Sequence, residues 1–523
     1  MPWRWILAYV AATFFAFPQP LGDSFVLDLG LVLAPAAPAL LLVALRGLAP
    51  GRALRVGFVA GWLAHAALLH WAYVVTVTYG HAPIVVGLLA PFGMSLYIVP
   101  FIAGFAWVAA LLAQRGLANP FLLAAAWTTF EWLRSWVLTG FGWGTIGYAW
   151  HQSPLLPSAQ YGGVYALTFG AALVGALAAS PRRGARRTAG VAFALHAVWL
   201  GLLVYPQIVR EFSYELVETH APERLVVVAA LQGNIDQGRK WDAPAFEETL
   251  LAYEELTREA ASNGAQLIAW PETAVPAPLA YPELQGRIAA LAREVRTPLI
   301  VGAVGLDFDA QGRPIAHYDS AFVFSAEGEL LDRYDKTHLV PFGEYLPLRP
   351  LLGHFIQALA TGSISSDVTE GARVRAIDVP LANGDTLRVG IPICYELIFP
   401  DLVRRFADDG AELLVGITND AWYGRTGSPY QFLAMTALRS AETRLPTLRA
   451  ANTGVSAVIH SDGRTVMQTR IFERGLVRSA VVVASDPGRR TFYTRHGDLF
   501  AHACTVATVL ASFLAFFRGR KSS

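Results

Sequence analysis

Three residues of different chemical types stand at or near the ends of apolar runs, and together they could carry out thiol-based acyl transfer. Glu272 lies in IAWPETAVP, Lys336 in RYDKTHLVPFGEYLP and Cys394 in VGIPICYELIFPDL. A thiol supplies a nucleophile, a carboxylate takes its proton, and an ammonium stabilises the oxyanion of a tetrahedral intermediate. The three residues therefore predict an enzyme that forms a covalent thioester.

Cys394 has two interpretations, an inert core residue or the nucleophile. It ends the strand-like run LRVGIPI and precedes the helix-like YELIFPDLVRRF, so we expect a turn where the helix N-terminus favours the thiolate. Neighbouring Glu396 and the charged segments elsewhere favour the nucleophile. The other cysteine, Cys504, lies in an apolar C-terminal run, so we expect neither a disulfide nor a metal site.

Glu272 and Lys336 each have a simpler alternative role. Glu272 directly follows an apolar run, so it is either a solvated loop carboxylate or a general base whose pKa is raised by burial. Lys336 either forms a surface ion pair with Asp335 or serves the thiol. We expect Glu344, in PFGEYLP, to orient Lys336 or Glu272, and His338 to be structural.

The composition favours a membrane protein. The chain has 523 residues, 54% hydrophobic and 15% charged, with a formal net charge of +1. Soluble proteins carry about 25% charged residues. Because the charges balance, the composition gives no general case for a nucleic-acid partner.

Eight apolar stretches predict membrane-spanning helices. We place them at 4–18, 25–45, 56–78, 83–113, 118–134, 161–180, 189–209 and 499–517. The fourth is too long for one simple span, so we expect it to tilt, kink or extend beyond the bilayer. The first resembles a secretory signal, but no small-residue cleavage site follows it, so we expect it to be retained.

The basic residues predict the orientation of these helices. If the N-terminus is cytoplasmic, the loops PQPLGDS and YGHAP lie outside and carry no Lys or Arg. The cytoplasmic loops and tail then hold Arg46, Arg52, Arg55, Arg115, Arg182, Arg183, Arg186, Arg187, Arg518, Arg520 and Lys521. We therefore predict a seven-span domain over 1–209, a linker over 210–223, a periplasmic catalytic domain over 224–495, and an eighth span with a cytoplasmic tail over 496–523.

Two features of the membrane part have alternative explanations. Glu131 and Arg134 are one helical turn apart, so they either pair with each other at the interface or support the site. Segment 135–161 is rich in glycine and aromatic residues. It is either an aromatic belt at the membrane surface or a loop that grips lipid beneath the outer domain.

The outer part alternates strand-like and helix-like runs and predicts an α/β domain. Strands are expected at 225–231, 267–270, 299–304, 321–324, 387–393, 413–417, 455–459 and 477–483. Helices are expected at 244–262, 284–295, 397–408 and 430–441. The loop ITNDAWYG, with Asp420 and Trp422, follows one strand end and is expected at the same sheet edge as Cys394.

The motifs WPET, YDKTHLVPFGEYLP, ICYELIFP and TNDAWYG together resemble the nitrilase, or carbon–nitrogen hydrolase, superfamily over residues 224–487. The resemblance implies an αββα sandwich with Glu272 as general base, Lys336 as oxyanion stabiliser and Cys394 as nucleophile. It also implies three supporting groups: Glu344 as an additional acidic residue, the Tyr395 backbone N–H in the oxyanion hole, and Glu396.

Because of the predicted spans, the chain more narrowly resembles the apolipoprotein N-acyltransferase family. LQGNIDQGRKWD and TALRSAETRLPTLRAANTG are similar to segments of that family. The resemblance implies that substrate is bound by Trp241, Phe342, Asn419, Asp420 and Trp422. GSPYQF departs from the family's Gly-Pro-x-Gln-His stretch, since Ser428 and Phe432 replace the glycine and the histidine.

The resemblance implies a two-step ping-pong reaction in a bacterial inner membrane. The thiol would take the sn-1 acyl chain of a phospholipid, typically phosphatidylethanolamine. The acyl chain would then pass to the α-amine of the S-diacylglyceryl cysteine of an apolipoprotein. The family uses no metal or diffusible cofactor, and we expect a monomer without a nucleic-acid partner.

Two other functions fit parts of the sequence. A membrane-tethered amidase or nitrile hydrolase would use the same three residues on a small amide, but eight spans exceed what a tether needs. A transporter or lipid-binding protein with an inactive outer domain would not need Glu272, Lys336 and Cys394 together.

Overall fold

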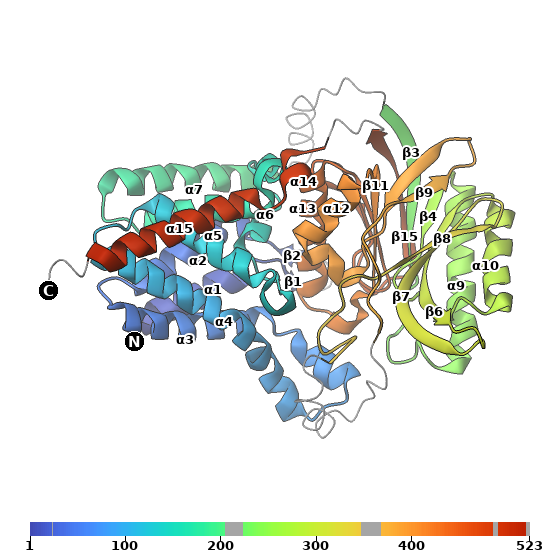
Figure 1. Cartoon of the computed structure of the whole chain (residues 1–523), viewed down its shortest axis with the longest axis horizontal. Coiled ribbons are helices and arrows are strands. Elements are labelled where there is room, and N and C mark those ends of the chain that lie inside the picture. Colours follow the sequence, from blue (N-terminus) through green and yellow to red (C-terminus); the bar gives the residue numbers. More distant parts are fainter. Residues whose placement is uncertain (23–24, 204–222, 347–367, 485–489, 519–523) are drawn as a thin grey trace.

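The computed structural model describes residues 1–22, 25–203, 223–346, 368–484 and 490–518, which form two parts (Figure 1). A bundle of helices from the two ends of the chain forms one part. The middle of the chain forms a layered α/β part beside it. Apart from Glu223, the predicted linker 210–223 lies outside the described residues.

The bundle has a helix at each of the eight predicted apolar stretches. These are α1 Trp3–Phe15, α2 Gly30–Ala44, α3 Pro50–Leu68, α4 Ile84–Gln114, α5 Pro120–Arg134, α6 Ala159–Ala178, α7 Arg183–Leu203 and α15 Leu499–Arg518. Prolines start α3 and α5, where their missing N–H has no helical partner to lose. The Asn119 side chain caps α5 by accepting a hydrogen bond from the backbone N–H of Leu122 (3.0 Å).

The stretch 25–45 is not one continuous helix. Its first residues form strand β2 Phe25–Leu27, which pairs antiparallel with β1 Gln19–Leu21. Helix α2 therefore starts only at Gly30. The predicted span was too long because its apolar start belongs to a hairpin.

The stretch 56–78 is also interrupted. Helix α3 ends at Leu68, and the residues Val74–Tyr79 form a π-helix, η1. Its sequence VVTVTY is rich in β-branched residues, which lose side-chain freedom in an α-helix. A π-helix is rare and is often found at functional sites.

Three helical stretches of the described chain are long and apolar enough to cross a membrane: Ile84–Gln114, Leu156–Ala178 and Leu499–Arg518. A span needs about 20 apolar residues. The other helices at predicted spans are shorter or less apolar, so helix length supports three spans, and eight stays a prediction.

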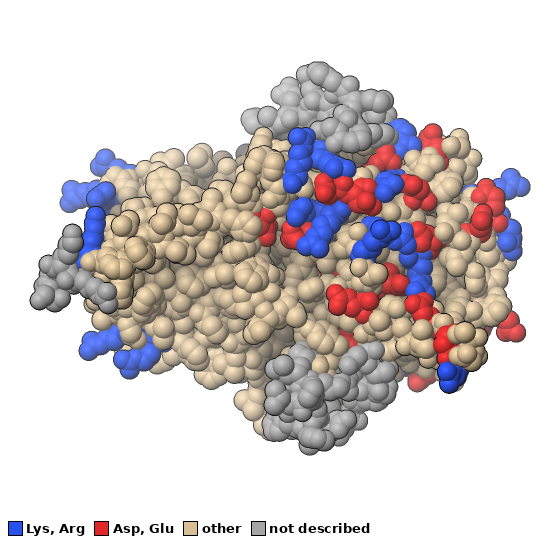
Figure 2. All heavy atoms as spheres, viewed as in Figure 1, with Lys and Arg blue, Asp and Glu red and all other residues tan. Residues whose placement is uncertain are grey.

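The charged residues are unevenly distributed between the two parts. On the face in Figure 2, the bundle is almost free of charge except for Lys and Arg at the end away from the α/β part. Charges of both signs cover the α/β part on this face. An uncharged belt with basic residues at one end is typical of a membrane domain and its cytoplasmic side.

Two sheets pack face to face in the α/β part. One has the order β15 Gly475–Ala484, β3 Glu223–Gln232, β4 Leu267–Ala269, β6 Leu299–Phe308, β7 Pro314–Phe324 and β8 Leu330–Asp335, with β5 Val275–Pro278 beside β6. The other has the order β14 Thr465–Gln468, β13 Ala457–Ile459, β12 Thr447–Ala451, β11 Leu413–Thr418, β10 Thr386–Gly390 and β9 Ile377–Pro380.

Helices cover the outer face of each sheet, which gives the predicted αββα sandwich (Figure 1). Helices α9 Ala243–Ser262 and α10 Pro282–Val295 lie on one side. Helices α12 Pro400–Asp408 and α13 Ser428–Thr443 lie on the other, between the second sheet and the bundle. The central strands β4 and β11 are fully buried, as expected of parallel strands covered on both faces.

The predicted strands and helices of this part are all present. The sequence analysis missed β5, β8, β9, β12 and β14, which are four to six residues long and have weak patterns of their own. It also started α12 too early, at Leu397. The helix begins at Pro400, because proline favours the first helical position and moves the residue before it away from helical geometry.

The aromatic segment 135–161 lies beneath the α/β part. Trp143, Tyr148 and Trp150 are buried, and the Tyr148 hydroxyl donates to the carbonyl of Ile398 (3.0 Å). The Trp143 indole N–H donates to Gln431 of α13 (2.9 Å). A surface aromatic belt does not describe these buried contacts. Whether the segment grips lipid remains a proposal.

Glu131 and Arg134 hold this segment in place as well as pairing with each other. Their side chains are 3.9 Å apart. Arg134 also donates to the carbonyl of Trp143 (2.8 Å), and Glu131 accepts from the backbone N–H of Ile146 (3.1 Å). The two residues therefore pair with each other, as one alternative predicted, and they also anchor segment 135–161; support of the site by this pair stays a prediction.

Candidate functional site

Glu272, Lys336 and Cys394 form one buried cluster. They follow strands β4, β8 and β10, and the structure leaves them 6%, 0% and 8% exposed. The Lys336 Nζ donates to Glu272 Oε1 (3.0 Å), and the Cys394 thiol is a hydrogen-bond partner of the Glu272 carboxylate. Residues separated by 122 positions in the sequence are therefore brought to a single point.

A close backbone contact positions Glu272. Gly302, in the neighbouring strand β6, packs against the turn after β4 so closely that a Cβ there would lie 2.1 Å from the carbonyl oxygen of Pro271 and 2.8 Å from the Cα of Glu272. Only glycine allows this approach. The turn itself has a positive φ of 46° at Thr273.

Three carboxyl groups surround Lys336. Its Nζ lies 3.0 Å from Glu272, 3.2 Å from Asp319 and 2.5 Å from Glu344. The other oxygen of Glu344 accepts from the backbone N–H of Val340 (2.9 Å). Although burial opposes its charge, these carboxyl groups raise the pKa of Lys336 well above its usual value, so the ammonium is retained.

The same carboxyl groups do not make a metal site. Oxygens of Glu272, Asp319 and Glu344 lie within 4.8 Å of one another. The Lys336 Nζ is within hydrogen-bond distance of all three, so it already supplies the cation that such a cluster needs. Among the described residues, this is the only carboxylate, histidine or cysteine cluster of metal-binding size.

Glu272 is ionised, contrary to the predicted rise in its pKa. Burial alone would raise the pKa, but the charge of Lys336 and hydrogen bonds with Asp319, Cys394 and Lys336 lower it to about 2. A carboxylate that acts as a base must be ionised before the reaction. The cluster therefore holds Glu272 in the form that can take a proton.

Cys394 is a protonated thiol, contrary to the expectation that a helix N-terminus favours the thiolate. It begins a short 3-10 segment, η5 Cys394–Ile398, and α12 starts only at Pro400. Burial, followed by the charge of Glu272, raises the pKa of Cys394 well above its usual value. Its φ of 48° lies in the left-handed region, which non-glycine residues adopt infrequently.

Glu396 joins the Cys394 loop to the Lys336 segment. Its carboxylate accepts from the backbone N–H groups of Ile393 and Thr337, both at 2.7 Å, and from the hydroxyls of Tyr334 (2.8 Å) and Thr337 (2.7 Å). Glu396 is fully buried and cannot contact substrate without a rearrangement. It therefore positions the two loops that carry Cys394 and Lys336.

Replacing Glu396 by alanine is expected to slow acyl transfer about 10- to 1,000-fold. Four donors, two of them fully buried, would lose their acceptor, at about 1–3 kcal/mol for each group that stays unsatisfied, so the two loops would rearrange. Initial rates with the alanine and glutamine variants measure this, since glutamine replaces the carboxylate by a neutral acceptor. Wild-type rates in the alanine variant would show that these contacts do not hold the loops.

Tyr395 and His338 link the site to the bundle. The Tyr395 hydroxyl donates to the carbonyl of Gly140 (3.1 Å) in segment 135–161. The His338 ring lies on Phe399 and Tyr395, with centroids 4.0 and 5.7 Å away. Burial, then the charge of Lys336, lowers the pKa of His338 to about 4, so it is neutral, as befits the structural role predicted for it.

Three of the five predicted binding residues are open to a ligand. Trp241 is 58% exposed, Phe342 57% and Trp422 39%. Each is near a site residue in sequence, and the Trp422 ring contacts Tyr79 of η1, with centroids 5.6 Å apart. These three rings therefore expose apolar surface on segments that carry or adjoin site residues.

The other two predicted binding residues have their side chains engaged elsewhere. Asp420 is buried and forms hydrogen bonds of 2.8 and 3.1 Å with Arg449. Asn419 donates to Gln237 (2.7 Å) and accepts from Asn452 (3.2 Å). Both side chains hold the loop that carries Trp422, and a role for either residue in binding substrate stays a prediction.

The two positions that depart from the family's pattern lie in the interface between the parts. Ser428 and Phe432 are buried, and the Phe432 ring packs against Trp143, with centroids 5.8 Å apart. The Arg449 guanidinium lies 4.9 Å from the centre of the same ring. Phe432 therefore supports segment 135–161 and the ion pair of Arg449.

The sequence analysis missed two buried residues of the site. Asp319, in HYDSAF, lies in β7, and Lys240 precedes the predicted Trp241. The Lys240 Nζ donates to the backbone carbonyl of Glu272 (3.3 Å), and burial lowers its pKa to about 8. A charged residue next to a predicted motif was the available signal for Lys240. Asp319 had no such signal.

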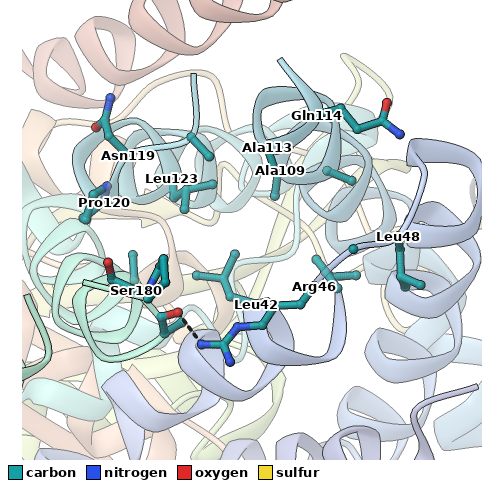
Figure 3. Close-up of a pocket in the computed structure, with 17 residues that line it drawn as sticks. Leu42, Arg46, Leu48, Ala109, Ala113, Gln114, Asn119, Pro120, Leu123 and Ser180 are labelled. Atoms are coloured by element: carbon teal, nitrogen blue, oxygen red, sulfur yellow. Dashed lines mark hydrogen bonds between the residues drawn. The ribbon is translucent and has the colours of Figure 1, made fainter. Parts of the chain in front are cut away.

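A separate cavity of about 520 Å³ lies between the ends of α2, α4, α5 and α6 (Figure 3). Its walls are mostly apolar, and Arg46 at its edge donates to the carbonyl of Ala179. None of the predicted site residues lines it. It is therefore separate from the site of Cys394.

Two family models match the chain and together cover most of it. Residues 227–485 match the carbon–nitrogen hydrolase model, and residues 5–177 match the apolipoprotein N-acyltransferase N-terminal domain. The first contains Glu272, Lys336 and Cys394. The second contains the bundle through most of α6.

Relatives with both parts cover nearly the whole chain. An apolipoprotein N-acyltransferase of Geobacter metallireducens is 37% identical over 90% of this chain and 88% of its own length. That of Vibrio vulnificus is 30% identical over 93% and 92%, and that of Nitrosomonas europaea 33% over 91% and 91%. A solved carbon–nitrogen hydrolase from Helicobacter pylori covers 53% of this chain and 95% of its own, with 15% identity and a TM-score of 0.39.

Proposed function

The chain belongs to the apolipoprotein N-acyltransferase family, and we propose that it acylates lipoproteins by a ping-pong reaction at Glu272, Lys336 and Cys394. It is an acyltransferase of bacterial lipoprotein biosynthesis, with phospholipid and lipoprotein as its substrates. The proposal concerns the route, the residues and the arrangement in the membrane.

In the first step, the ionised Glu272 takes the proton of the Cys394 thiol, and the sulfur attacks the carbonyl carbon of the sn-1 ester. Lys336 and the backbone N–H of Tyr395 stabilise the oxyanion. The C–O bond then breaks, Glu272 returns the proton to the leaving oxygen, and lysophospholipid departs. Phosphatidylethanolamine is our proposed donor, and a Cys394 thioester remains.

In the second step, the neutral α-amine of the S-diacylglyceryl cysteine attacks the thioester carbonyl. Glu272 takes a proton from the attacking nitrogen, and the C–S bond breaks. The proton passes to the sulfur, which restores the thiol and releases the N-acylated lipoprotein. Every proton is accounted for within the site and its two substrates, and no step calls for a metal or a cofactor.

One observation carries the proposal: the carboxylate, ammonium and thiol meet in one buried cluster, with the Lys336 Nζ 3.0 Å from Glu272 Oε1 and Cys394 beside Glu272. A nucleophile with a base beside it and a cation nearby is the arrangement that base-assisted attack requires. Water would hydrolyse the thioester, so a buried site against a membrane part favours transfer over hydrolysis.

We further propose eight spans, with both termini in the cytoplasm and residues 224–495 in the periplasm of the inner membrane. The eight helices of the bundle and the basic residues at its far end support this arrangement. Helices shorter than the bilayer thickness would tilt less than the long helices and would thin the bilayer locally. The proposed functional unit is a monomer.

Aromatic residues are the proposed contacts for the donor's acyl chain. Trp241, Phe342 and Trp422 are exposed on segments next to Lys240, Glu344 and Asp420. Segment 135–161 is the proposed floor of this path, since Gly140 and Tyr148 contact the loop after Cys394. The exposed rings offer apolar surface without a charge that would select a head group.

A direct assay tests the function. The full-length enzyme in detergent micelles is incubated with phosphatidylethanolamine and a synthetic diacylated lipopeptide that has a free α-amine. We expect the lipopeptide to gain one acyl chain on nitrogen and lysophospholipid to appear in equal amount. An N-acetylated lipopeptide serves as the control and should gain none. Hydrolysis of a small amide without lipopeptide acylation would favour the tethered amidase.

A further inference from the structure

Asp319 is a mostly buried carboxyl group that the reaction above does not use. It lies in β7, and its Oδ2 is 3.2 Å from the Lys336 Nζ. Its side chain is 11% exposed. It stands with Glu272 and Glu344 in the cluster whose oxygens lie within 4.8 Å of one another.

The charges of this cluster do not balance if every carboxyl group is ionised. Three carboxylates beside the two ammonium groups of Lys336 and Lys240 would leave one net negative charge in a mostly buried site. Like charges at this separation cannot all ionise, as in a carboxylate pair that shares one proton. At least one carboxyl group must therefore keep its proton.

The hydrogen bonds indicate which group keeps it. Glu272 accepts from Lys336 and Cys394, and the second oxygen of Glu344 accepts from Val340. By contrast, Oδ1 of Asp319 is buried and accepts no hydrogen bond in the described part of the chain. A bare carboxylate oxygen without a donor is costly to bury, whereas a protonated one becomes a donor.

We propose that Asp319 is a neutral carboxylic acid that donates its proton as a hydrogen bond to Glu272 and so positions the base for Cys394. Asp319 is a positioning residue, because it acts through Glu272 and does not touch the acyl group. Its proton stays on it throughout both steps, while a second proton moves between Glu272, sulfur and the leaving or attacking atom. This inference rests on the proposed function.

The titration of the cluster agrees with this assignment. Burial, followed by the charge of Glu272, raises the pKa of Asp319 well above its usual value. The charged or titratable groups that act on Asp319 are Glu272, Glu344, Lys336 and Lys240. The two carboxyl groups favour its neutral form, and the two ammonium groups oppose it.

A neutral Asp319 predicts a specific pH dependence. As pH rises through its pKa, Asp319 would gain a negative charge beside Glu272, and formation of the Cys394 thiolate would become harder. The rate of acyl-enzyme formation should therefore fall on the alkaline side. Asparagine has the same shape and cannot ionise, so Asp319→Asn should lose that fall while keeping the hydrogen bond to Glu272.

The test measures single-turnover acylation of Cys394 by intact-protein mass spectrometry across pH, with phosphatidylethanolamine as donor. We expect Asp319→Asn to stay within about fivefold of the wild-type rate at neutral pH and to extend the plateau to higher pH. Asp319→Ala should lose about 10- to 100-fold at every pH, because Glu272 loses its donor. If the asparagine variant keeps the rate and the alanine variant loses it, the side chain at position 319 acts by its hydrogen bond to Glu272.

Asp335→Asn is the matched control. Asp335 lies at the end of the neighbouring strand β8 and pairs with Arg333 (2.9 Å), away from the Lys336 Nζ. The same change of charge there should leave the pH profile as in the wild type. If Asp319→Asn loses as much activity as Asp319→Ala, Asp319 acts as an anion and the inference is wrong. If the wild-type enzyme forms no adduct, the proposed function fails instead.

Discussion

Replacing Cys394 by alanine is expected to abolish the acyl-enzyme and to reduce acyl transfer about 10⁴- to 10⁶-fold, the scale of loss when a covalent nucleophile is removed. The wild-type protein, incubated with phosphatidylethanolamine, should gain the mass of one acyl chain, and Cys394→Ala should gain none. A diacylated lipopeptide should discharge the wild-type adduct much faster than water does. These masses are measured on the intact protein.

The chain supplies a matched control in Cys504. This second cysteine is also buried, at 6% exposure, but it lies in α15 of the bundle. Cys504→Ala should gain the acyl mass at the wild-type rate. Acylation that survives Cys394→Ala would mean that another group is the nucleophile, and loss of the adduct in Cys504→Ala would mean that the bundle thiol carries it.

The Cys394→Ala substitution should leave the fold nearly unchanged. Its thiol has no covalent partner, and alanine at the same left-handed φ adds no atoms. Removing the sulfur also removes the group that Glu272 would deprotonate, without leaving an unpaired charge. A similar melting temperature in detergent would therefore separate loss of chemistry from loss of structure.

The sequence was sufficient to single out the three residues that the fold brings together, because each lies at or near the end of an apolar run. A charge after a buried strand is costly unless it has a partner, so Glu272 and Lys336 stand out locally. Asp319 has no such signal. It lies inside a strand whose predicted extent, 321–324, did not include it, and its partners Glu272 and Lys336 are contacts made only by the fold.

The protonation states could not be predicted from local sequence, because they depend on burial and on distant charges. The Cys394 thiol was expected to be a thiolate from a helix start that lies instead at Pro400. Glu272 was expected to have a raised pKa because its neighbours in sequence are apolar. Lys336, 64 residues away, reverses that expectation.

The predicted binding residues also differ in whether local sequence or long-range contacts decide their environment. Trp241, Phe342 and Trp422 are exposed, as a local pattern of aromatic residues in loops can indicate. Asp420 is adjacent to this loop in sequence, but its carboxylate pairs with Arg449, 29 residues later in the chain. Long-range pairing of this kind is visible only once strands β11 and β12 lie side by side.

Replacing Lys336 by methionine is expected to affect both activity and stability. Loss of one oxyanion-stabilising group costs about 10²- to 10³-fold in rate. Removing one partner of a buried ion pair destabilises a protein by about 3–5 kcal/mol, because the remaining charge is left without compensation. Here three carboxyl groups would lose their shared cation, so Lys336→Met should melt well below the wild type and transfer acyl chains far more slowly.

The stability loss should depend on pH in a direction that the site fixes. In the wild type, Glu272 has a pKa of about 2, below its usual value of 4.5. Its stabilising contribution is therefore present above pH 4.5 and is lost as pH falls toward 2. Without Lys336, burial would raise the pKa of Glu272 above 4.5. The variant would then lose stability as pH rises from 4.5 through this raised pKa. The difference in melting temperature should therefore be larger at pH 7 than at pH 4.5.

Lys240→Met tests whether this effect belongs to the carboxyl cluster or to any buried lysine nearby. Lys240 is also an ammonium buried beside Glu272, but within the described residues its Nζ donates to a backbone carbonyl, at 3.3 Å, and forms no ion pair with a carboxyl group. The same substitution there should lower the melting temperature less and show little change between pH 7 and pH 4.5. Equal effects of the two variants would contradict the role given to Lys336, because contact with the three carboxyl groups would then make no difference.

If Lys336→Met does not fold, Lys336→Arg provides a second test. Arginine keeps the positive charge, but its planar group fits the cluster poorly. We therefore expect Lys336→Arg to keep most of the melting temperature and to lose most of the transfer rate.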